Sequence, residues 1–234
     1  MIICIMGKSG TGKDTVTEEL INSTSLKLER LVPYTTRPKR PNEIEGREYH
    51  FVTEETYKTL LLQDKIIESR EYPHYIDGNV RYFTVNDIDP QKDYILITVP
   101  EAFRTIADYC EGKSIGVKGI YLDLDPLERL ERLSKREKET GGQKYEELIR
   151  RYIADEKDYS KEKLDYYFKD KSKILFKNDY LHRQPISIVK NENLQGTVGL
   201  CEYIISGLQK DIAYSKQSDS KTLSESITEP DISL

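Results

Sequence analysis

Cysteine and histidine are scarce in this sequence, and neither residue type has the spacing of a metal site. The sequence holds three of each, namely Cys4, Cys110, Cys201, His50, His74 and His182. An odd number of widely separated cysteines argues against a disulfide framework, and scattered histidines argue against a zinc site. We therefore expect a cytoplasmic protein whose fold depends on neither disulfides nor a structural metal.

Long apolar runs are also missing, and so is an overall excess of positive charge. No apolar run approaches membrane-spanning length, and no signal segment precedes the first one, at residues 2–6. The net charge of -5 argues against a general nucleic-acid binder. Basic residues nevertheless cluster at 37–40 and around 129–136, which favours a small anionic ligand. We expect small-molecule partners, no membrane or nucleic-acid partner, and a monomer or homodimer.

The segment at residues 7–15 is the most informative feature that is present. It reads GKSGTGKDT and lies between the apolar run 2–6 and a helix-forming stretch. Its glycines permit backbone angles at which successive N–H groups turn inward around phosphate oxygens, and Lys13 then reaches the outer phosphates. The residues expected to bind a nucleoside triphosphate here are Gly7, Ser9, Gly10, Thr11, Gly12, Lys13, Asp14 and Thr15. The alternative is a flexible glycine-rich turn without a ligand.

The residue after the lysine departs from the usual phosphate-loop pattern. Serine or threonine normally stands there as a Mg²⁺ ligand, whereas this sequence has Asp14 followed by Thr15. A carboxylate also binds Mg²⁺, directly or through water, and a neighbouring hydroxyl adds a second oxygen. We therefore expect Asp14 and Thr15 to bind the metal with altered geometry.

Strand and helix patterns alternate along most of the chain. We expect strands at residues 2–6, 49–52, 94–99, 119–124 and 186–189, and helices at residues 13–22, 53–61, 100–109, 126–139, 144–158 and 194–208. Thr53 and Asp125 are the expected N-caps of two of these helices. Residues 66–85 are rich in tyrosine, isoleucine and valine around a turn at 77–79, which predicts an antiparallel hairpin. The alternation predicts an α/β fold with a central parallel sheet.

Two segments do not fit the alternation. Residues 161–184 are aromatic and basic, and we interpret them as an insertion. Residues 212–234 lack apolar periodicity, and we expect a disordered tail there. The predicted organisation is one domain over residues 1–211, with a small lobe at about 33–88 and a helical lid at about 126–158. Glycines 141 and 142 are the expected joint of the lid.

Residues 35–52 resemble a known family. They read TTRPKRPNEIEGREYHFV, which is similar to the guanylate kinase signature T-T-R-x-x-R-x-x-E-x-x-G-x-x-Y-x-F-V. With the phosphate loop and the lid, the resemblance covers most of residues 2–208 and is weakest in the insertion. It implies the three-layer α/β/α fold of P-loop NTPases with a small antiparallel nucleotide-binding lobe. It also implies phosphorylation of a nucleoside monophosphate, most directly GMP or dGMP, by ATP with Mg²⁺.

The resemblance assigns the acceptor phosphate to arginines and tyrosines. The matching residues are Arg37, Arg40, Tyr49 and Tyr82, with Glu43 orienting the arginines. Guanidinium forks match phosphate oxygens in pairs, and phenol hydroxyls add direction without further charge. The alternative for Tyr82 is simple packing in an aromatic lobe, because the chain has 17 tyrosines.

The base-reading positions match the family only in part. Glu68 ends an IIE segment that resembles the family's F-[IL]-E, whose carboxylate accepts hydrogen bonds from guanine N1–H and the 2-amino group. Thr84 matches a residue that supports the base. Pro33 and Val99 stand where the family has polar base contacts, and Tyr34 offers a hydroxyl in place of the first. Losing two contacts would weaken guanine binding by about 10- to 1000-fold.

The lid supplies the remaining expected residues. The segment LERLSKR at 130–136 resembles the family's L-x-x-R-L-x-x-R, and residues 150–156 resemble its second arginine segment. The implied catalytic residues are Lys13, Arg37, Arg136 and Arg151, which would neutralise the transferring phosphoryl group. Asn191 resembles an adenosine-side residue of the family, and Asn178 is a rival match. A charged, solvated helix is the alternative for the lid arginines.

Two other function classes remain open. One is a kinase of the same fold that acts on a different nucleotide or on a ribose bisphosphate. The other is a non-enzymatic interaction module related to guanylate kinases. Such modules typically lack a working phosphate loop, whereas this sequence retains Gly7, Gly12 and Lys13.

Overall fold

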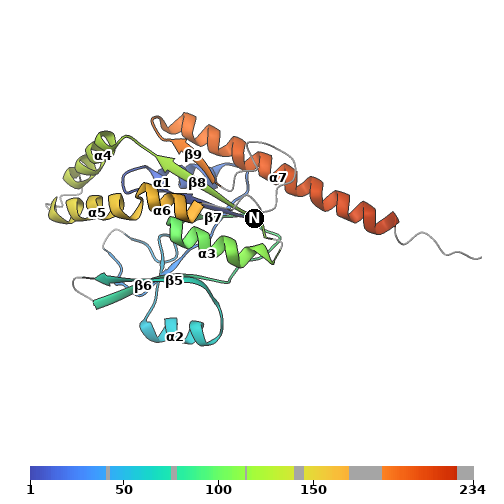
Figure 1. The fold of residues 1–234 in the computed structure, drawn as a ribbon, viewed down its shortest axis with the longest axis horizontal. Coiled ribbons are helices and arrows are strands. Elements are labelled where there is room, and N and C mark those ends of the chain that lie inside the picture. The colour runs from blue at the N-terminus through green and yellow to red at the C-terminus, as the bar shows by residue number, and fades with distance from the viewer. Residues whose placement is uncertain (41–42, 75–77, 114, 140–144, 169–185, 226–234) are drawn as a thin grey trace, which may run out of the picture.

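A parallel sheet forms the centre of the molecule (Figure 1). The computed structural model describes residues 1–40, 43–74, 78–113, 115–139, 145–168 and 186–225. Its five-stranded sheet has the order β2-β7-β1-β8-β9, and every neighbouring pair is parallel. The strands are β1 (Ile2–Met6), β2 (Glu29–Arg30), β7 (Tyr94–Ile97), β8 (Val117–Asp123) and β9 (Ile186–Lys190). The expected parallel sheet is confirmed.

Helices cover both faces of this sheet (Figure 1). Helices α1 (Lys13–Asn22) and α7 (Leu194–Glu225) lie on one face, and α3 (Pro100–Glu111) and α6 (Lys161–Phe168) lie on the other. Because side chains alternate along a strand, Ile3 packs on the first pair of helices and Cys4 on the second. Burial of all of β1 follows, and the arrangement is the three-layer α/β/α fold of P-loop NTPases.

A smaller lobe is attached to one side of the sheet. Its four-stranded sheet has the order β4-β3-β6-β5, with β5 and β6 forming the expected antiparallel hairpin. The lobe consists of β3 (Tyr34–Thr35), β4 (His50–Phe51), β5 (Ile66–His74), β6 (Gly78–Val85) and helix α2 (Glu54–Leu62). Thr53 caps α2, because its hydroxyl accepts a hydrogen bond from the Thr56 amide at 3.2 Å. Tyr57, Phe83 and Val85 form a separate small core.

Two charged helices lie at one end of the sheet, over the residues for which a lid is predicted (Figure 1). They are α4 (Pro126–Glu139) and α5 (Tyr145–Asp158). Asp125 caps α4, since its carboxylate accepts hydrogen bonds from the amides of Leu127 at 2.9 Å and Glu128 at 3.3 Å. The glycine joint expected at 141–142 lies outside the described residues. No helix in the described parts of the chain combines the length and apolarity of a membrane span.

The C-terminal part of the chain differs from the expectation. Helix α7 does not end near Leu208 but continues to Glu225 and projects beyond the core (Figure 1). The expected disordered tail is therefore wrong over 212–225, where no glycine or proline interrupts the helix; residues 226–234 lie outside the described residues. The expected insertion begins as α6, whose Phe168 ring lies 6.3 Å from that of Phe103. Its remainder also lies outside the described residues.

Candidate active site

The phosphate loop connects β1 to α1 through backbone that only glycine adopts readily. Gly10 and Gly12 have φ angles of 87° and 85°, and Gly12 is the N-cap of α1. A Cβ atom on Gly12 would lie 2.5 Å from Nδ2 of Asn191. The loop therefore passes close to β9, and a side chain at this position would push it away.

Lys13 is folded back onto the loop that precedes it. Its Nζ donates hydrogen bonds to the carbonyls of Gly7 at 2.7 Å and Lys8 at 3.1 Å. Burial lowers the pKa of Lys13, Asp14 and Asp155 oppose that shift, and Arg136 adds to it. The lysine is thus held at the loop, within electrostatic range of both lid helices.

A carboxylate from the lid already lies in the phosphate loop. The Ser9 amide donates to Oδ2 of Asp155 on α5 at 2.6 Å, and Lys8 forms an ion pair with Glu156 at 2.6 Å. A phosphate-binding turn uses its backbone amides to donate hydrogen bonds to an anion, as the Ser9 amide does here. The loop therefore fits a phosphate group. Sequence reasoning missed Asp155, because no local pattern indicates that it reaches a segment so distant in the chain.

The two expected metal ligands lie at the exposed start of α1. Asp14 and Thr15 line a cavity of about 440 Å³ together with Pro33 and Tyr49 from the lobe. No group of three or more histidine, cysteine or acidic side chains with metal-binding geometry occurs in the part of the chain that the structure describes. A carboxylate and a hydroxyl beside the phosphate loop fit Mg²⁺, which keeps several waters and takes few protein ligands.

Asn191 lies behind the phosphate loop. Its buried side chain donates to the Thr11 carbonyl at 2.7 Å, and its own carbonyl accepts from Nη2 of Arg132 at 3.0 Å. Its side-chain amide therefore supports the loop from the residue that directly follows β9. The rival residue, Asn178, lies outside the described residues.

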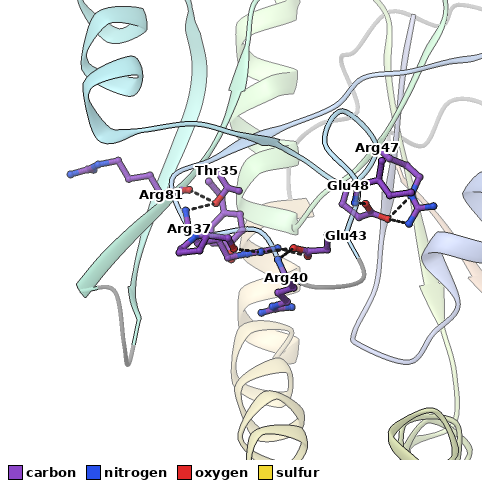
Figure 2. Close-up of polar contacts among 10 residues, drawn as sticks. Thr35, Arg37, Arg40, Glu43, Arg47, Glu48 and Arg81 are labelled. Atoms are coloured by element: carbon purple, nitrogen blue, oxygen red, sulfur yellow. Dashed lines mark hydrogen bonds and ion pairs between the residues drawn. The ribbon is translucent and has the colours of Figure 1, made fainter. Parts of the chain in front are cut away.

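The cluster expected to grip the acceptor phosphate is assembled in the lobe (Figure 2). Arg37 donates from Nη1 and Nη2 to the Glu43 carboxylate at 2.7 and 2.5 Å, and from Nε to the Tyr82 hydroxyl at 3.0 Å. Thr35 holds the same loop, because its hydroxyl donates to the Arg81 carbonyl at 2.8 Å and accepts from the Arg37 amide at 3.3 Å. The expected orienting contact of Glu43 is thus present.

Arg37 is buried, with a side-chain exposure of only 4%. Burial opposes its charge, but hydrogen bonds with Glu43 outweigh that effect and raise the pKa of Arg37. The same contacts hold the pKa of Glu43 below its ordinary value despite partial burial. Arg37 also lies over the Tyr49 ring, 5.2 Å from its centroid, and the Tyr49 and Tyr82 rings are 5.4 Å apart. Burial raises the pKa of Tyr49 to about 12, so it is a neutral hydroxyl.

Arg40 differs from Arg37 in its surroundings. Its amide donates to Glu43 at 2.9 Å, whereas its exposed side chain points away from that carboxylate (Figure 2). Arg47 and Glu48 form a separate, more exposed ion pair at the cavity that Asp14 lines. One arginine is therefore fixed in the cluster, and a second is available at its edge.

The base-reading candidate Glu68 is buried on β5. Its Oε1 accepts from the Thr84 hydroxyl at 2.8 Å, which brings these two expected residues together. Arg70, two residues along the same strand, donates to both carboxylate oxygens, at 2.9 and 3.3 Å. Sequence reasoning missed Arg70, although its alternation with Glu68 places both on one face of the strand.

The positions of missing polar base contacts are apolar as expected. Pro33 lines the 440 Å³ cavity, and Val99 is the N-cap of α3. Tyr34 lines a different hollow, of about 370 Å³, and its ring lies against those of His50 and Phe83. The expectation that Tyr34 substitutes for the lost serine hydroxyl is therefore not supported.

The lid arginines occupy different depths. Arg136 is exposed on α4, and Arg151 is half-buried on α5. Arg129, which sequence reasoning did not select, is almost fully buried, pairs with Glu156 at 2.6 Å, and lies 4.1 Å from the centroid of the Tyr152 ring. Arg129 therefore joins α4 to α5 above the phosphate loop.

Comparisons with known proteins show which family the chain belongs to. The family model for guanylate kinase matches residues 1–174. A guanylate kinase from Caldanaerobacter subterraneus subsp. tengcongensis is 32% identical over 155 residues, which is 65% of this chain and 70% of the relative. Another, from Streptococcus agalactiae serotype III, is 32% identical over 134 residues, 56% of this chain and 61% of the relative.

A solved structure shares the fold. It is the crystal structure of guanylate kinase from Anaplasma phagocytophilum. The match covers 89% of this chain and 86% of that chain, with a TM-score of 0.52 and a sequence identity of 19%. At that identity the likeness concerns the fold alone. The family model, in contrast, spans well over half of this chain. The chain therefore belongs to the guanylate kinase family, and with it to the nucleoside monophosphate kinases.

Proposed function

We propose that this protein transfers the γ-phosphoryl group of ATP to GMP or dGMP, with Mg²⁺ as cofactor. The observation that carries the proposal is the phosphate loop, in which Ser9 donates to a carboxylate and Lys13 lies on the loop carbonyls. A loop that holds an anion in this way supports catalysis over the alternative of a non-catalytic interaction module.

The acceptor phosphate would bind at the lobe cluster. Arg37 is held by Glu43 and Tyr82, and Arg40 and Tyr49 lie beside it. Prepositioned donors lose little entropy on binding and favour one orientation of the phosphate. Glu68 would read the guanine edge, with Thr84 holding the carboxylate in place.

The chemistry needs no general base, because a monophosphate already presents an ionised oxygen. That oxygen forms a bond to the γ-phosphorus while the bond from phosphorus to the bridging oxygen of ATP breaks and ADP leaves. Lys13, Arg37, Arg136 and Arg151 would neutralise charge on the transferring group. Mg²⁺, held by Asp14 and Thr15, would supply further charge neutralisation when bound.

A substrate panel tests the proposal. ADP release should be measured with ATP, Mg²⁺ and each of GMP, dGMP, AMP, CMP, UMP and a ribose bisphosphate. We expect the highest kcat/KM with GMP or dGMP, because adenine lacks the N1–H and 2-amino donors that guanine offers to the Glu68 carboxylate. Equal values for AMP and GMP would remove the role of Glu68, and a preference for the ribose bisphosphate would replace the substrate.

The phosphate loop is tested separately. Lys13→Ala should lower kcat by about 100-fold or more, since it removes a charge that acts on the transferring group. A matched control is Lys92→Ala, an exposed lysine paired with Glu29 at the far end of the sheet. Unchanged turnover in Lys13→Ala would end the phosphate-loop mechanism, and tight peptide binding without any turnover would favour the interaction module.

A further inference from the structure

One face of the β5–β6 hairpin carries charged side chains that would contact the base of the acceptor, if the proposed function holds. Glu68 pairs with Thr84 across the hairpin, and Arg70 pairs with Tyr82. Because alternate residues of a strand share a face, Arg70 lies between the base-reading carboxylate and the tyrosine of the phosphate cluster. Arg70 thus belongs to the acceptor site, although no feature of the family resemblance assigned it a role.

Arg70 engages Glu68 through a fork of two donors. Nε lies 2.9 Å from Oε2, and Nη2 lies 3.3 Å from Oε1. The side chains are enclosed, with exposures of 12% for Arg70 and 2% for Glu68. Arg70 also forms a hydrogen bond with Tyr72, whose ring lies 5.7 Å from that of Tyr82. The fork is therefore held in place from both sides.

The guanidinium fork has the same donor pattern as the guanine edge. Guanine offers N1–H and an amino N–H side by side, and Arg70 offers two neighbouring N–H groups to the same carboxylate. A carboxylate has about four lone-pair sites, and here Arg70 takes two and Thr84 takes one. The lone pair that remains accepts one donor, whereas the guanine edge needs two. Guanine and Arg70 consequently compete for Glu68.

We propose that Arg70 is a specificity-determining residue that acts as an internal competitor for the guanine edge. GMP binds with its base against Glu68 only after Arg70 has left the carboxylate. Base recognition is therefore an exchange, in which the two N–H donors of guanine replace the two N–H donors of Arg70. AMP, which does not use that carboxylate, binds without the exchange. Arg70 therefore narrows the difference in affinity between guanine and adenine nucleotides.

Steady-state kinetics of Arg70→Met test the exchange. We expect KM for GMP to fall about tenfold, as for one recovered hydrogen bond to a charged group, while KM for AMP and kcat stay near the wild-type values. Arg81→Met is the matched control, because Arg81 pairs with Glu54 and Glu71 and should leave both KM values unchanged. A rise in KM for GMP, or no change, would overturn the proposal.

Binding measurements keep the test valid if turnover or stability changes. Calorimetric titration with GMP and AMP should show the same selective gain in Arg70→Met, independently of catalysis. Glu68→Gln/Arg70→Met lacks the buried ion pair altogether and should lose the gain while remaining folded. Wild-type protein that binds GMP without phosphorylating it would defeat the proposed function alone, whereas equal binding changes for GMP and AMP would defeat the role of Arg70.

Adding a free guanidinium compound to a variant without Arg70 gives a measurement that would not change if Arg70 had a purely structural role. In Arg70→Ala the space of the fork is vacated, and added methylguanidinium should inhibit competitively with GMP. The same concentration should not inhibit the wild-type protein competitively, because its own guanidinium already fills the fork. Absence of competitive inhibition in Arg70→Ala would contradict the exchange.

Discussion

Arg37 has almost no contact with solvent, and its charge is compatible with that burial only because Glu43 lies against it. Both guanidinium nitrogens of the fork donate to this carboxylate, and Nε is committed to Tyr82. An arginine held in this way offers few directions in which a phosphate can approach. At the residue scale, the proposed acceptor site is therefore a fixed cluster of side chains, and the exposed Arg40 lies at its edge.

Glu43→Gln should destabilise the fold and weaken acceptor binding together. The change leaves the buried Arg37 without a compensating charge, so we expect the free energy of unfolding to fall by about 1–3 kcal/mol. Glu48→Gln is the control, because its pair with Arg47 is more exposed and should contribute less than about 1 kcal/mol. Denaturant unfolding measures both, and equal losses would contradict the importance of burial.

Glu43 also makes the stability of the folded protein depend on pH in a direction that can be predicted. The folded protein holds the pKa of Glu43 below its ordinary value of 4.5, so its contribution is present above that pH. The contribution is lost as the pH falls through the depressed pKa of the folded state. We therefore expect the stability difference between wild type and Glu43→Gln to shrink below about pH 4.5. Unfolding curves at pH values from about 6 to 3 measure this difference, and a constant difference would refute it.

At the scale of elements, helix α5 and the phosphate loop form a direct contact. Asp155 accepts from the Ser9 amide, Glu156 pairs with Lys8, and Arg129 joins α4 to the same carboxylate. One hydrogen bond and one ion pair therefore hold α5 against the loop, and the Arg129 ion pair holds α4 against α5. In the proposed function a nucleotide phosphate, which carries the same sign of charge as Asp155, would accept from the same Ser9 amide, so the two groups would be alternatives.

Asp155→Asn should therefore strengthen nucleotide binding. The change removes the negative charge that repels phosphate, and it weakens the hydrogen bond that the Ser9 amide donates to residue 155. We therefore expect KM for ATP to fall by up to about tenfold. Asp158→Asn is the control, because that residue lies on the same helix and pairs with Lys163 away from the loop. A higher KM for ATP in Asp155→Asn would mean that the carboxylate assists binding.

At the scale of the whole molecule, only the first part of α7 is seen to pack against the core. Its buried residues Cys201, Ile204, Ile205 and Leu208 pack on the central sheet, and Ile212 is the last residue at that core cluster among the α7 side chains that the structure describes, which end at Tyr214. Tyr214 is already 73% exposed. The remainder of the helix leads away from the body of the protein (Figure 1).

Truncation after Tyr214 should leave stability and turnover nearly unchanged. The removed segment follows Ile212, the last described side chain of α7 at the core, so we expect the free energy of unfolding to change by less than about 0.5 kcal/mol. Leu208→Ala, in contrast, opens a cavity in the core and should cost about 2–5 kcal/mol. Thermal and denaturant unfolding compare the two, and a large loss on truncation would show that the terminal segment stabilises the domain.

Local signals predicted the parts of this protein that depend on neighbouring residues. The strand at residues 2–6, the phosphate loop and the caps Thr53 and Asp125 follow from apolar runs, glycine spacing and short hydrogen bonds. The end of α7 was mispredicted because weak amphipathicity was interpreted as disorder, whereas helix propensity without glycine or proline carries the helix to Glu225.

Contacts between segments that are distant in the chain could not be predicted from the sequence. It identified Glu68 as a carboxylate that could read a base, but only the register of β5 against β6 shows which donors surround it. The contact of Asp155 with Ser9 likewise joins residues 146 positions apart, and no periodicity encodes such a pair. The sequence by itself predicted a phosphate loop at residues 7–15 and determined most of the order in which strands and helices alternate. The tertiary structure decided which side chains lie at the proposed phosphate and base positions, because that depends on packing between elements.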